Sequence, residues 1–274
     1  MESHIKASVN LISRIVKGKP DAPLIVNFSG GKDSLCCLLL ALSVTDDVEC
    51  LYMASGLELP GTIDYVDARC KEFGVPLNIS DPQIHRIRHR RGGGVPVDCC
   101  LLPDYVRHWG YFPTSAKRYC STWLKHRPGR VLCRQNWGLT SIFKIVGIRL
   151  SESNIRRYRY GSTKTCMKFG GRYIRPDREH SGSYMVFPIL DWTQQHVEQF
   201  LADHQVEIHE GYKHFGTSGC AWCPVMKPAT AQLIAAKFPG IYDELVAAEA
   251  AIKKPAWYHR NVWLKDIVEA ATKI

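Results

Sequence analysis

The sequence predicts an α/β fold: a parallel, twisted sheet with helices on both faces, followed by a C-terminal helical segment that contains cysteines. Three observations support this class. Short apolar runs of strand length alternate with longer runs of helical spacing through the first third of the chain. A glycine-rich turn joins the first short run directly to a helical run. The composition, 45% hydrophobic and 23% charged over 274 residues, is that of a globular protein and excludes disordered and collagen-like classes.

The N-terminal part carries the clearest alternation. Ile5, Val9, Ile12 and Val16 recur at helical spacing and predict an amphipathic helix before the first strand. Three strand-like runs then alternate with two helical runs, as expected for parallel strands joined by helical crossovers. In chain order these runs are Leu24–Phe28, Leu35–Ser43, Val48–Met53, Ile63–Phe73 and Val75–Ile79.

The rest of the chain contains two further strand candidates and then turns helical. Ile142–Gly147 predicts a fourth strand after a long, basic, irregular stretch, and Tyr184–Ile189 predicts an edge strand or a fifth strand. After Asp191 the predicted helices are Thr193–His204, Ile241–Ile252 and Val262–Thr272. We therefore expect an α/β domain over residues 1–190 and a helical region over residues 191–274.

No segment of the sequence predicts membrane insertion or secretion. The longest apolar run, Leu35 to Leu42, is much shorter than the roughly 18 to 20 residues that cross a bilayer. The stretch Met1–Asp21 lacks the apolar core and the small-residue cleavage site of a signal peptide. We expect a soluble, cytoplasmic protein with no membrane partner.

Positive charge is concentrated in one part of the chain. The whole sequence has 36 Lys and Arg against 26 Asp and Glu, but Arg86–Arg175 alone holds 20 of these bases and only three acids, Asp98, Asp104 and Glu152. This asymmetry predicts a positive surface or cleft whose partner is a polyanion, either nucleotide phosphate or nucleic acid. A solvated basic face that only improves solubility is the alternative.

The strongest local signal is the turn Ser29-Gly30-Gly31-Lys32-Asp33-Ser34 between a predicted strand and a predicted helix. Glycines let the backbone approach a phosphate, and the amides of the helix N-terminus donate to it. The turn is not a Walker A loop, because Lys32 is followed by Asp33 and the spacing of the glycines differs. It predicts a phosphate cradle; a ligand-free glycine-rich turn is the alternative.

The eleven cysteines are expected to be reduced thiols, because the chain shows no secretory signal and an odd number cannot pair completely. Cys220 and Cys223 form a Cys-x-x-Cys turn bounded by Gly219 and Pro224. Such a turn can place two thiolates on one metal ion or cluster. Spacing leaves zinc, an iron–sulfur cluster and a redox dithiol open, with unliganded cysteines as a further alternative.

Two further ligands must come from elsewhere in the chain. Cys120 is the best third candidate, because the basic residues around it are expected to lower its pKa. Cys166, between Lys164 and Lys168, is the fourth candidate. The rivals are Cys99, Cys100 and Cys133.

Five sequence blocks, in order, resemble the PP-loop ATP pyrophosphatases of the adenine-nucleotide α-hydrolase-like superfamily, in the branch of the sulfonucleotide (PAPS/APS) reductases. The resemblance covers about residues 24–224 and implies the HUP/PP-loop type of α/β fold. It also implies an adenine nucleotide across the carboxyl ends of the strands, attacked at its α-phosphate with pyrophosphate as the leaving group. The blocks are Ser29–Ser34, Ala54–Pro60, Tyr119–Lys125, Val146–Ser153 with Arg156 and Arg157, and Phe187–Trp192.

The resemblance also assigns site residues. It implies a cradle for ATP made of Ser29, Gly30, Gly31, Asp33 and Ser34, with backbone near Phe28 and Met53 reading the adenine. The α-phosphoryl transition state gathers negative charge, which Lys32, Arg149 and Arg156 or Arg157 can stabilise together with Mg²⁺ held by phosphates and a carboxylate. Gly147 is expected to let the ribose or a phosphate approach. Glu152 is either an orienting ion-pair partner or a handler of metal or protons.

Resemblance to sulfur-handling members of the branch favours a [4Fe–4S] cluster over zinc, on Cys120, Cys166, Cys220 and Cys223. The family has tandem cysteines where this chain has Tyr119-Cys120, which leaves the fourth ligand open. Sulfonucleotide reductases attack with a cysteine in a C-terminal motif, and this sequence has no cysteine after Cys223. The sequence is therefore most similar to the ATP pyrophosphatases of DNA phosphorothioation, the DndC/SspD type.

We accordingly expect an enzyme that adenylates a nucleic-acid oxygen, DNA backbone phosphate foremost, before sulfur incorporation. Its expected partners are nucleic acid, a cysteine desulfurase as sulfur donor and other modification-complex subunits, with a homo-oligomer as an option. The alternatives are a sulfonucleotide reductase and a tRNA thiolation enzyme. A further alternative is a non-catalytic nucleic-acid-binding subunit with structural zinc, whose interleaved tyrosines Tyr158, Tyr160 and Tyr173 would contact the nucleic acid.

Overall fold

The fold was analysed on a computed structural model of the chain, which describes residues 1–85, 99–138, 140–161, 173–177, 182–257 and 260–272. These residues form two compact units, each made of three stretches of chain. Unit 1 comprises Met1–Tyr52, Gly61–Ile79 and Leu132–His209, and unit 2 comprises Met53–Pro60, Ser80–Val131 and Glu210–Ile274. The units interleave along the sequence. The linear division after residue 190 stays a prediction.

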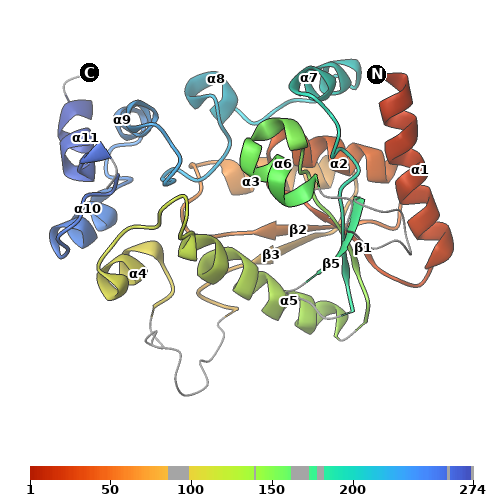
Figure 1. The fold of residues 1–274 in the computed structure, drawn as a ribbon, viewed down its shortest axis with the longest axis horizontal. Helices are drawn as coiled ribbons and strands as arrows, with labels where there is room; N and C mark the ends of the chain where they lie inside the picture. Colours follow the sequence, from red (N-terminus) through yellow and green to blue (C-terminus); the bar gives the residue numbers. More distant parts are fainter. Residues whose placement is uncertain (86–98, 139, 162–172, 178–181, 258–259, 273–274) are drawn as a thin grey trace. The chain divides into compact units, whose positions relative to one another are not determined.

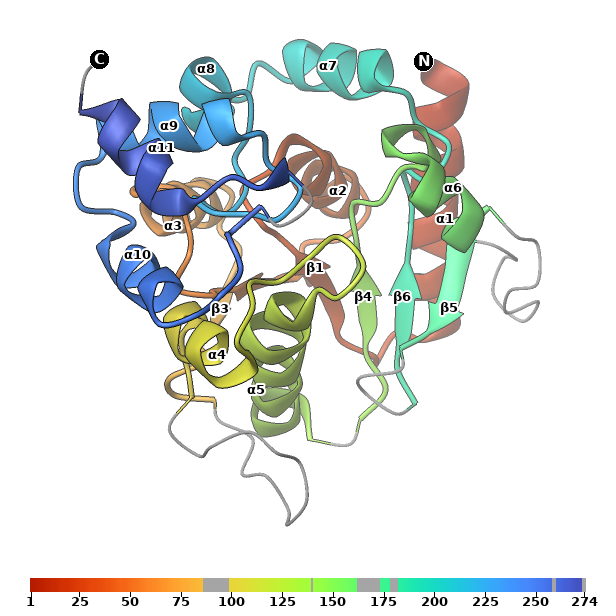
Figure 2. The same cartoon turned by 60° about the vertical axis from the view of Figure 1, so that its left-hand side comes forward.

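A six-stranded sheet of order β3-β2-β1-β4-β6-β5 forms the centre of unit 1, and the last residues of β2 and β3 are counted with unit 2. From β1 (Leu24–Asn27) the chain proceeds to β2 (Glu49–Met53) and β3 (Leu77–Ser80), then returns to β4 (Phe143–Ile145) on the other side of β1 (Figure 2). β1 pairs in parallel with both β2 and β4. This reversal creates a switch point at the carboxyl ends of β1 and β4, where open α/β sheets bind ligands.

The far side of the sheet differs in detail from the expectation. β6 (Tyr184–Val186) pairs in parallel with β4 and therefore lies inside the sheet. The edge is β5 (Ile174–Pro176), which is antiparallel to β6 and was not predicted. Three residues ending in proline are too few to show strand alternation, and proline is tolerated at such an edge.

Helices cover both faces of the sheet, as predicted. One face carries α1 (Glu2–Gly18), α2 (Lys32–Leu42) and α3 (Thr62–Glu72), and the opposite face carries the C-terminal half of α5 (Arg127–Trp137) (Figure 1). The helix predicted before the first strand is confirmed as α1, and its buried apolar side chains are Leu11, Ile12 and Ile15. α7 (Gln194–Asp203) packs on α2.

Unit 2 is a helical unit with its own core. Its helices are α4 (Leu102–Trp109), the start of α5, α8 (Gly211–Phe215), α9 (Pro228–Lys237), α10 (Asp243–Ala250) and α11 (Leu264–Ala271). α9 packs on α11 and α4 on α10. The fully or nearly fully buried side chains of this core include Leu102, Trp222, Ile234, Tyr242 and Leu264.

The stretch expected to be irregular contains two helices, α4 and α5. A π-helical turn at Ser121–His126 leads into α5. Pro128 and Gly129 lie directly after this π-helical turn, at the start of α5. Within the described ranges, none of the helices combines the length and apolar character needed to cross a bilayer.

Candidate functional site

The predicted phosphate cradle lies at the switch point of the sheet. Phe28 is fully buried directly after β1, and its N–H donates to Leu51 O at 3.1 Å. Gly30 has a φ of +75°, and an added Cβ would lie 3.1 Å from a methyl group of Val66. A side chain is therefore disfavoured at Gly30 by both conformation and space. Gly31 then forms the N-cap of α2.

Hydrogen bonds of the Ser34 side chain connect the end of the cradle to its beginning. Its hydroxyl accepts from the Ser29 N–H at 3.2 Å and donates to Gly31 O at 2.8 Å. The two serine hydroxyls are also 3.1 Å apart. Gly31 supplies no side-chain cap to α2, so the first-turn amides of this helix keep the donor character that phosphate oxygens require. These donors are compatible with a phosphate group, and phosphate binding by the loop stays a prediction.

Gly147, just after β4, lies against the first turn of α2. A Cβ on Gly147 would be 2.8 Å from the Asp33 carbonyl carbon and 2.9 Å from Ser34 N. Because these are backbone atoms, no side-chain movement could relieve the overlap. The glycine is thus required for packing of the β4 loop on the cradle. Its expected contact with ribose or phosphate stays a prediction.

Arg149 connects the β4 loop to the cradle and to α7. Its guanidinium donates to Asp33 Oδ1 at 2.9 Å, to Ser151 Oγ at 3.1 Å and to Gln194 Oε1 at 2.9 Å. The residue is only 5% exposed. Three acceptors therefore fix a positive charge beside the phosphate cradle. Gln194 was not predicted as a site residue. Its partner Arg149 lies 45 positions away, and nothing in the sequence around Gln194 indicates this contact.

The Glu152 carboxylate accepts hydrogen bonds from two residues close to it in the sequence. Its Oε2 accepts from the Arg149 N–H at 3.2 Å and from the Arg156 guanidinium. Burial raises the pKa of Glu152 above its usual range, although Arg156 opposes this shift. The arrangement matches the orienting alternative, in which the carboxylate holds Arg156.

The remaining basic candidates are more accessible. Lys32 Nζ lies 3.7 Å from Glu198 Oε1, with 21% of the lysine side chain exposed. Arg157 is exposed on α6 (Asn154–Tyr160). Tyr158 is 89% exposed on the same helix.

The other two interleaved tyrosines have structural contacts. Tyr160 packs on Phe187, with ring centroids 5.3 Å apart, and Tyr173 Oη donates to Asp191 Oδ2 at 2.5 Å.

A second site lies within unit 2, where three of the sequence motifs meet. The loop Ala54–Pro60 pairs with the Cys-x-x-Cys turn through a bridge between Glu58 and Cys220. The Ala221 N–H donates to Leu57 O at 2.5 Å. Glu58 Oε1 in turn accepts from the N–H and the hydroxyl of Ser55, at 2.6 and 2.7 Å. This loop therefore positions Cys220, a role that its sequence did not reveal.

Lys125 is the cation of this site. Its Nζ donates to Cys220 Sγ at 3.3 Å, and the Ser55 hydroxyl is 3.9 Å from the same sulfur. Burial alone would lower the pKa of Lys125, but Cys220 and Glu58 outweigh it and raise that pKa. The lysine therefore stays an ammonium beside the Cys220 sulfur.

Cys220 raises the pKa of Cys120 and that of Cys223, and Cys223 also raises the pKa of Cys120; the three thiols therefore lie near one another, and we call them the thiol cluster. Burial is the main cause that raises the pKa of Cys120 to about 11, and the opposing effect of Lys125 is smaller. The expectation that basic neighbours lower this pKa is therefore wrong. Burial also raises the pKa of Cys223.

The fourth thiol, Cys166, lies outside the described residues. Of the rivals, Cys99 and Cys100 belong to unit 2, and Cys133 is buried in unit 1 beside Lys144. Among the residues described, no set of three or more Cys, His, Asp or Glu side chains has the spacing of a metal site. Three neighbouring thiols with an adjacent ammonium nevertheless have the donor chemistry of an iron–sulfur or zinc site.

Met53, the last residue of β2, is counted with unit 2, where its Sδ lies 3.1 Å from a Cβ built on Gly129. Its expected role beside adenine, like that of Phe28, stays a prediction.

Comparison with known proteins places this geometry in a family. Residues 23–226 match the model of the phosphoadenosine phosphosulfate reductase domain. An uncharacterized protein of Methanocaldococcus jannaschii is 27% identical over 253 residues, which cover 88% of this chain and 45% of that protein. The chain spans about half the length of the curated relatives it matches.

Two solved structures align with 80% of this chain. An FMN adenylyltransferase from Candida glabrata, in complex with FAD and inorganic pyrophosphate, matches with a TM-score of 0.50 and 14% identity over 80% of this chain and 64% of that one. A PAPS reductase from Candida auris, in complex with phosphate, has a TM-score of 0.49 and 14% identity over 80% of this chain and 95% of that one. The match of the domain model over most of the chain, with its motifs gathered at the cradle and at the thiol cluster, shows that the chain belongs to the phosphoadenosine phosphosulfate reductase domain family.

Proposed function

We propose that this protein is an ATP pyrophosphatase that adenylates a nucleic-acid oxygen, most directly a DNA backbone phosphate, for replacement by sulfur. The observation that carries the proposal is the cradle closed by Ser34, with Asp33 held by the buried Arg149. The chain therefore contains both a loop that would bind the triphosphate and the thiol cluster. Activation and sulfur handling are the two chemical tasks of such a reaction.

The first step is nucleophilic substitution at the α-phosphorus of ATP. An oxygen of the acceptor forms a bond to this phosphorus, the bond to the bridging oxygen breaks, and pyrophosphate leaves. The amides of Gly30 to Ser34 would bind the departing phosphates, and Lys32 would neutralise their charge. Arg149 would hold Asp33 in place, and Arg156, oriented by Glu152, would face the developing charge. Mg²⁺, when bound, would supply Lewis-acid neutralisation of the negative charge on the phosphates.

The second step replaces the activated oxygen by sulfur. A sulfur nucleophile bonds to the acceptor phosphorus, the bond from that phosphorus to the AMP oxygen breaks, and AMP leaves. A cysteine desulfurase would provide this nucleophile as a persulfide, and a thiol reductant would then cleave the remaining S–S bond, leaving sulfur on the phosphorus and the two thiols as a disulfide. Four thiols would hold a [4Fe–4S] cluster: Cys120, Cys220, Cys223 and, as the fourth, Cys166. When bound, this cluster would supply a site for sulfur, whereas zinc would only crosslink the thiols. Lys125 would position the Cys220 sulfur through its hydrogen bond.

The positive stretch of the chain supports a polyanionic acceptor. Arg157 and the largely exposed Tyr158 present cationic and aromatic side chains together on α6. Such a pairing suits nucleic acid, because arginine contacts phosphate and an exposed ring stacks on a base. Other subunits of a modification complex, and a second copy of the chain, are further proposed partners.

The test is product analysis under anaerobic conditions. The protein is incubated with ATP and Mg²⁺, with and without DNA and a cysteine desulfurase, and the phosphorus products are resolved. AMP and pyrophosphate, formed faster with DNA, are expected. ADP and phosphate, or no turnover under any of these conditions, would overturn the proposal.

Sulfonucleotide reduction is the second candidate, and the match to the phosphoadenosine phosphosulfate reductase domain favours it. In that reaction a thiolate attacks the sulfur of the sulfonucleotide and the nucleotide leaves. Release of sulfite from PAPS or APS in the presence of a dithiol would identify it. No sulfite, together with DNA-dependent pyrophosphate release, would exclude it.

A further inference from the structure

A cavity in unit 2 is lined by residues that belong neither to the cradle nor to the thiol cluster. Its volume is about 310 Å³, and it lies between the segment after α4 and the segment that precedes Trp257. Tyr111 and Phe112 line it from the first segment, and Pro255 and Ala256 from the second. A space of this size, with mainly apolar and aromatic walls, is typical of sites for small organic ligands.

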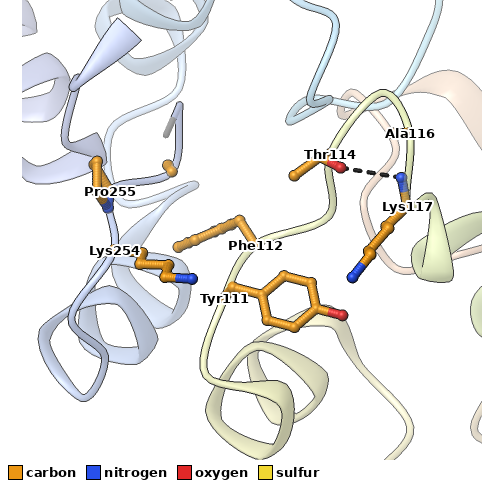
Figure 3. Close-up of a pocket in the computed structure, with 8 residues that line it drawn as sticks. Tyr111, Phe112, Thr114, Ala116, Lys117, Lys254 and Pro255 are labelled. Atoms are coloured by element: carbon orange, nitrogen blue, oxygen red, sulfur yellow. Dashed lines mark hydrogen bonds between the residues drawn. The ribbon is translucent and has the colours of Figure 1, made fainter. Parts of the chain in front are cut away.

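Two lysines give the cavity a positive character. Figure 3 shows the ammonium ends of Lys117 and Lys254 pointing toward the ring of Tyr111 from opposite sides. Lys117 Nζ lies 5.9 Å from the centre of that ring. The turn that carries Lys117 is fixed, because the Lys117 N–H donates to Thr114 Oγ1 at 3.0 Å. A flat ring with an attached anion matches these walls and charges: the ring stacks on the aromatic side chains and the anion contacts the lysines.

The aromatic walls of the cavity contact the segments that carry the thiol cluster. Phe112 packs on Trp222, with ring centroids 4.9 Å apart, and Trp222 stands between Cys220 and Cys223. Tyr119, which precedes Cys120, donates through its hydroxyl to Tyr111 O at 2.6 Å. One layer of side chains thus connects the cavity with both cysteine segments. A ligand in the cavity would therefore be held beside the sulfur chemistry.

We propose that this cavity binds one nucleoside monophosphate unit, with the base against Tyr111 and Phe112 and the phosphate on Lys117 and Lys254. A nucleobase supplies the flat ring, and its phosphate supplies the anion. The unit could be a free nucleotide or a nucleotide within a strand. The inference deepens the proposed function, since it names a binding place for part of the acceptor, but the binding itself requires no cleavage of ATP.

The test is calorimetric titration of the whole protein with thymidine 5′-monophosphate, a pyrimidine that avoids the adenine site implied for unit 1. We expect saturable binding that thymidine, which has no charge, reproduces about tenfold more weakly. The double variant Lys117→Ala/Lys254→Ala should weaken binding of the monophosphate by about tenfold or more. Lys253→Ala removes an equal exposed charge next to Lys254 and should leave binding unchanged.

Equal binding of inorganic phosphate and of the nucleotide would mean an adventitious ion only and would overturn the proposal. Equal affinity of the double variant and the wild type, or no binding of any nucleotide, would also overturn it. A tetranucleotide of thymidine distinguishes the two sources. If the tetranucleotide binds more tightly than the monophosphate, and the double variant loses this binding, the ligand is a nucleotide within a strand. If the two bind equally, the ligand is a free nucleotide.

Pyrophosphate release by the wild type and the double variant, measured with DNA present as the acceptor, separates this inference from the proposed function. If nucleotide binding follows the lysines but neither protein releases pyrophosphate, the cavity assignment stands and the proposed function fails. If both proteins release pyrophosphate but neither binds the nucleotide, the reverse holds.

Discussion

Arg149 and Asp33 form a 2.9 Å ion pair between the loop after β4 and the first turn of α2, with 6% of the arginine side chain and 18% of the aspartate side chain exposed. The pair connects two residues 116 positions apart in the sequence. It therefore fixes the cradle relative to the neighbouring strand, and its integrity should be measurable both as stability and as activity.

Replacing Arg149 by glutamine should remove this connection. The Asp33 carboxylate would lose its partner while largely shielded from water, which is expected to cost about 2 to 4 kcal/mol of unfolding free energy. Pyrophosphate release should fall roughly a hundredfold, because the cradle loses its support. Urea unfolding and product analysis measure the two effects. Arg14→Gln, on the exposed face of α1, is the control; equal losses in both variants would refute the assigned role.

Gly147→Ala tests the close approach of two backbone segments. The added methyl group would lie 2.8 Å from the Asp33 carbonyl carbon, so the β4 loop must move, at a cost of about 1 to 3 kcal/mol. Gly18→Ala is the matched control, since an added Cβ at Gly18 has no atom within 4 Å. Thermal unfolding of both variants measures the difference. An alanine at 147 tolerated as well as the one at 18 would contradict the described packing.

The raised pKa of Glu152 predicts that the stability of the protein depends on pH. Its pKa is raised in the folded protein, so between about pH 4.5 and that raised pKa the folded state binds more protons than the unfolded state. This carboxyl therefore makes stability fall as pH rises through that interval. Glu152→Gln should flatten the fall, whereas Asp46→Asn, at an exposed carboxyl, should not. Urea midpoints from pH 4 to pH 7 give the comparison, and parallel curves for wild type and Glu152→Gln would exclude this contribution.

Cys220→Ser and Cys223→Ser should each abolish any brown chromophore near 400 nm in protein purified without oxygen, because each removes a proposed cluster ligand. Cys133→Ala is the informative control. Its thiol is buried beside Lys144 in unit 1, and we expect the absorbance to persist. Iron and sulfide analysis accompanies the spectra. A spectrum unchanged by both serine variants would remove these residues from the ligand set.

Glu249 should matter for the stability of unit 2. This carboxylate is 1% exposed and accepts from the N–H groups of Ala256, Leu264 and Lys265 at 2.8 to 3.0 Å. Glu249→Ala leaves three buried donors without acceptors and should cost about 2 to 4 kcal/mol in urea unfolding. Glu269→Ala, at an exposed position of α11, should change stability by less than about 0.5 kcal/mol.

The parts of the fold that local sequence determines were predictable. The cradle from Ser29 to Ser34 follows from glycine spacing and its place between a strand and a helix, and both are visible within a few residues. The relation of Lys125 to Cys220 was not predictable, because 95 residues separate them and only the fold brings them together. The pKa of Cys120 was predicted in the wrong direction because its basic neighbours are visible in the sequence and its burial is not. The edge strand β5 escaped prediction because three residues carry no periodicity.

The interleaving of the two units has a consequence for biosynthesis. Ser55 and Cys220, which contact each other, are 165 residues apart, so a ribosome that adds about 5 to 20 residues per second completes this pair on the order of ten seconds after the first partner emerges. During that delay Cys120 is already outside the ribosome without Cys220 and Cys223. Any metal or cluster that all three thiols held together could form only after Cys223 has emerged, roughly a hundred residues after Cys120. Until then a nascent chain would depend on reducing conditions, or on a chaperone, to keep Cys120 intact.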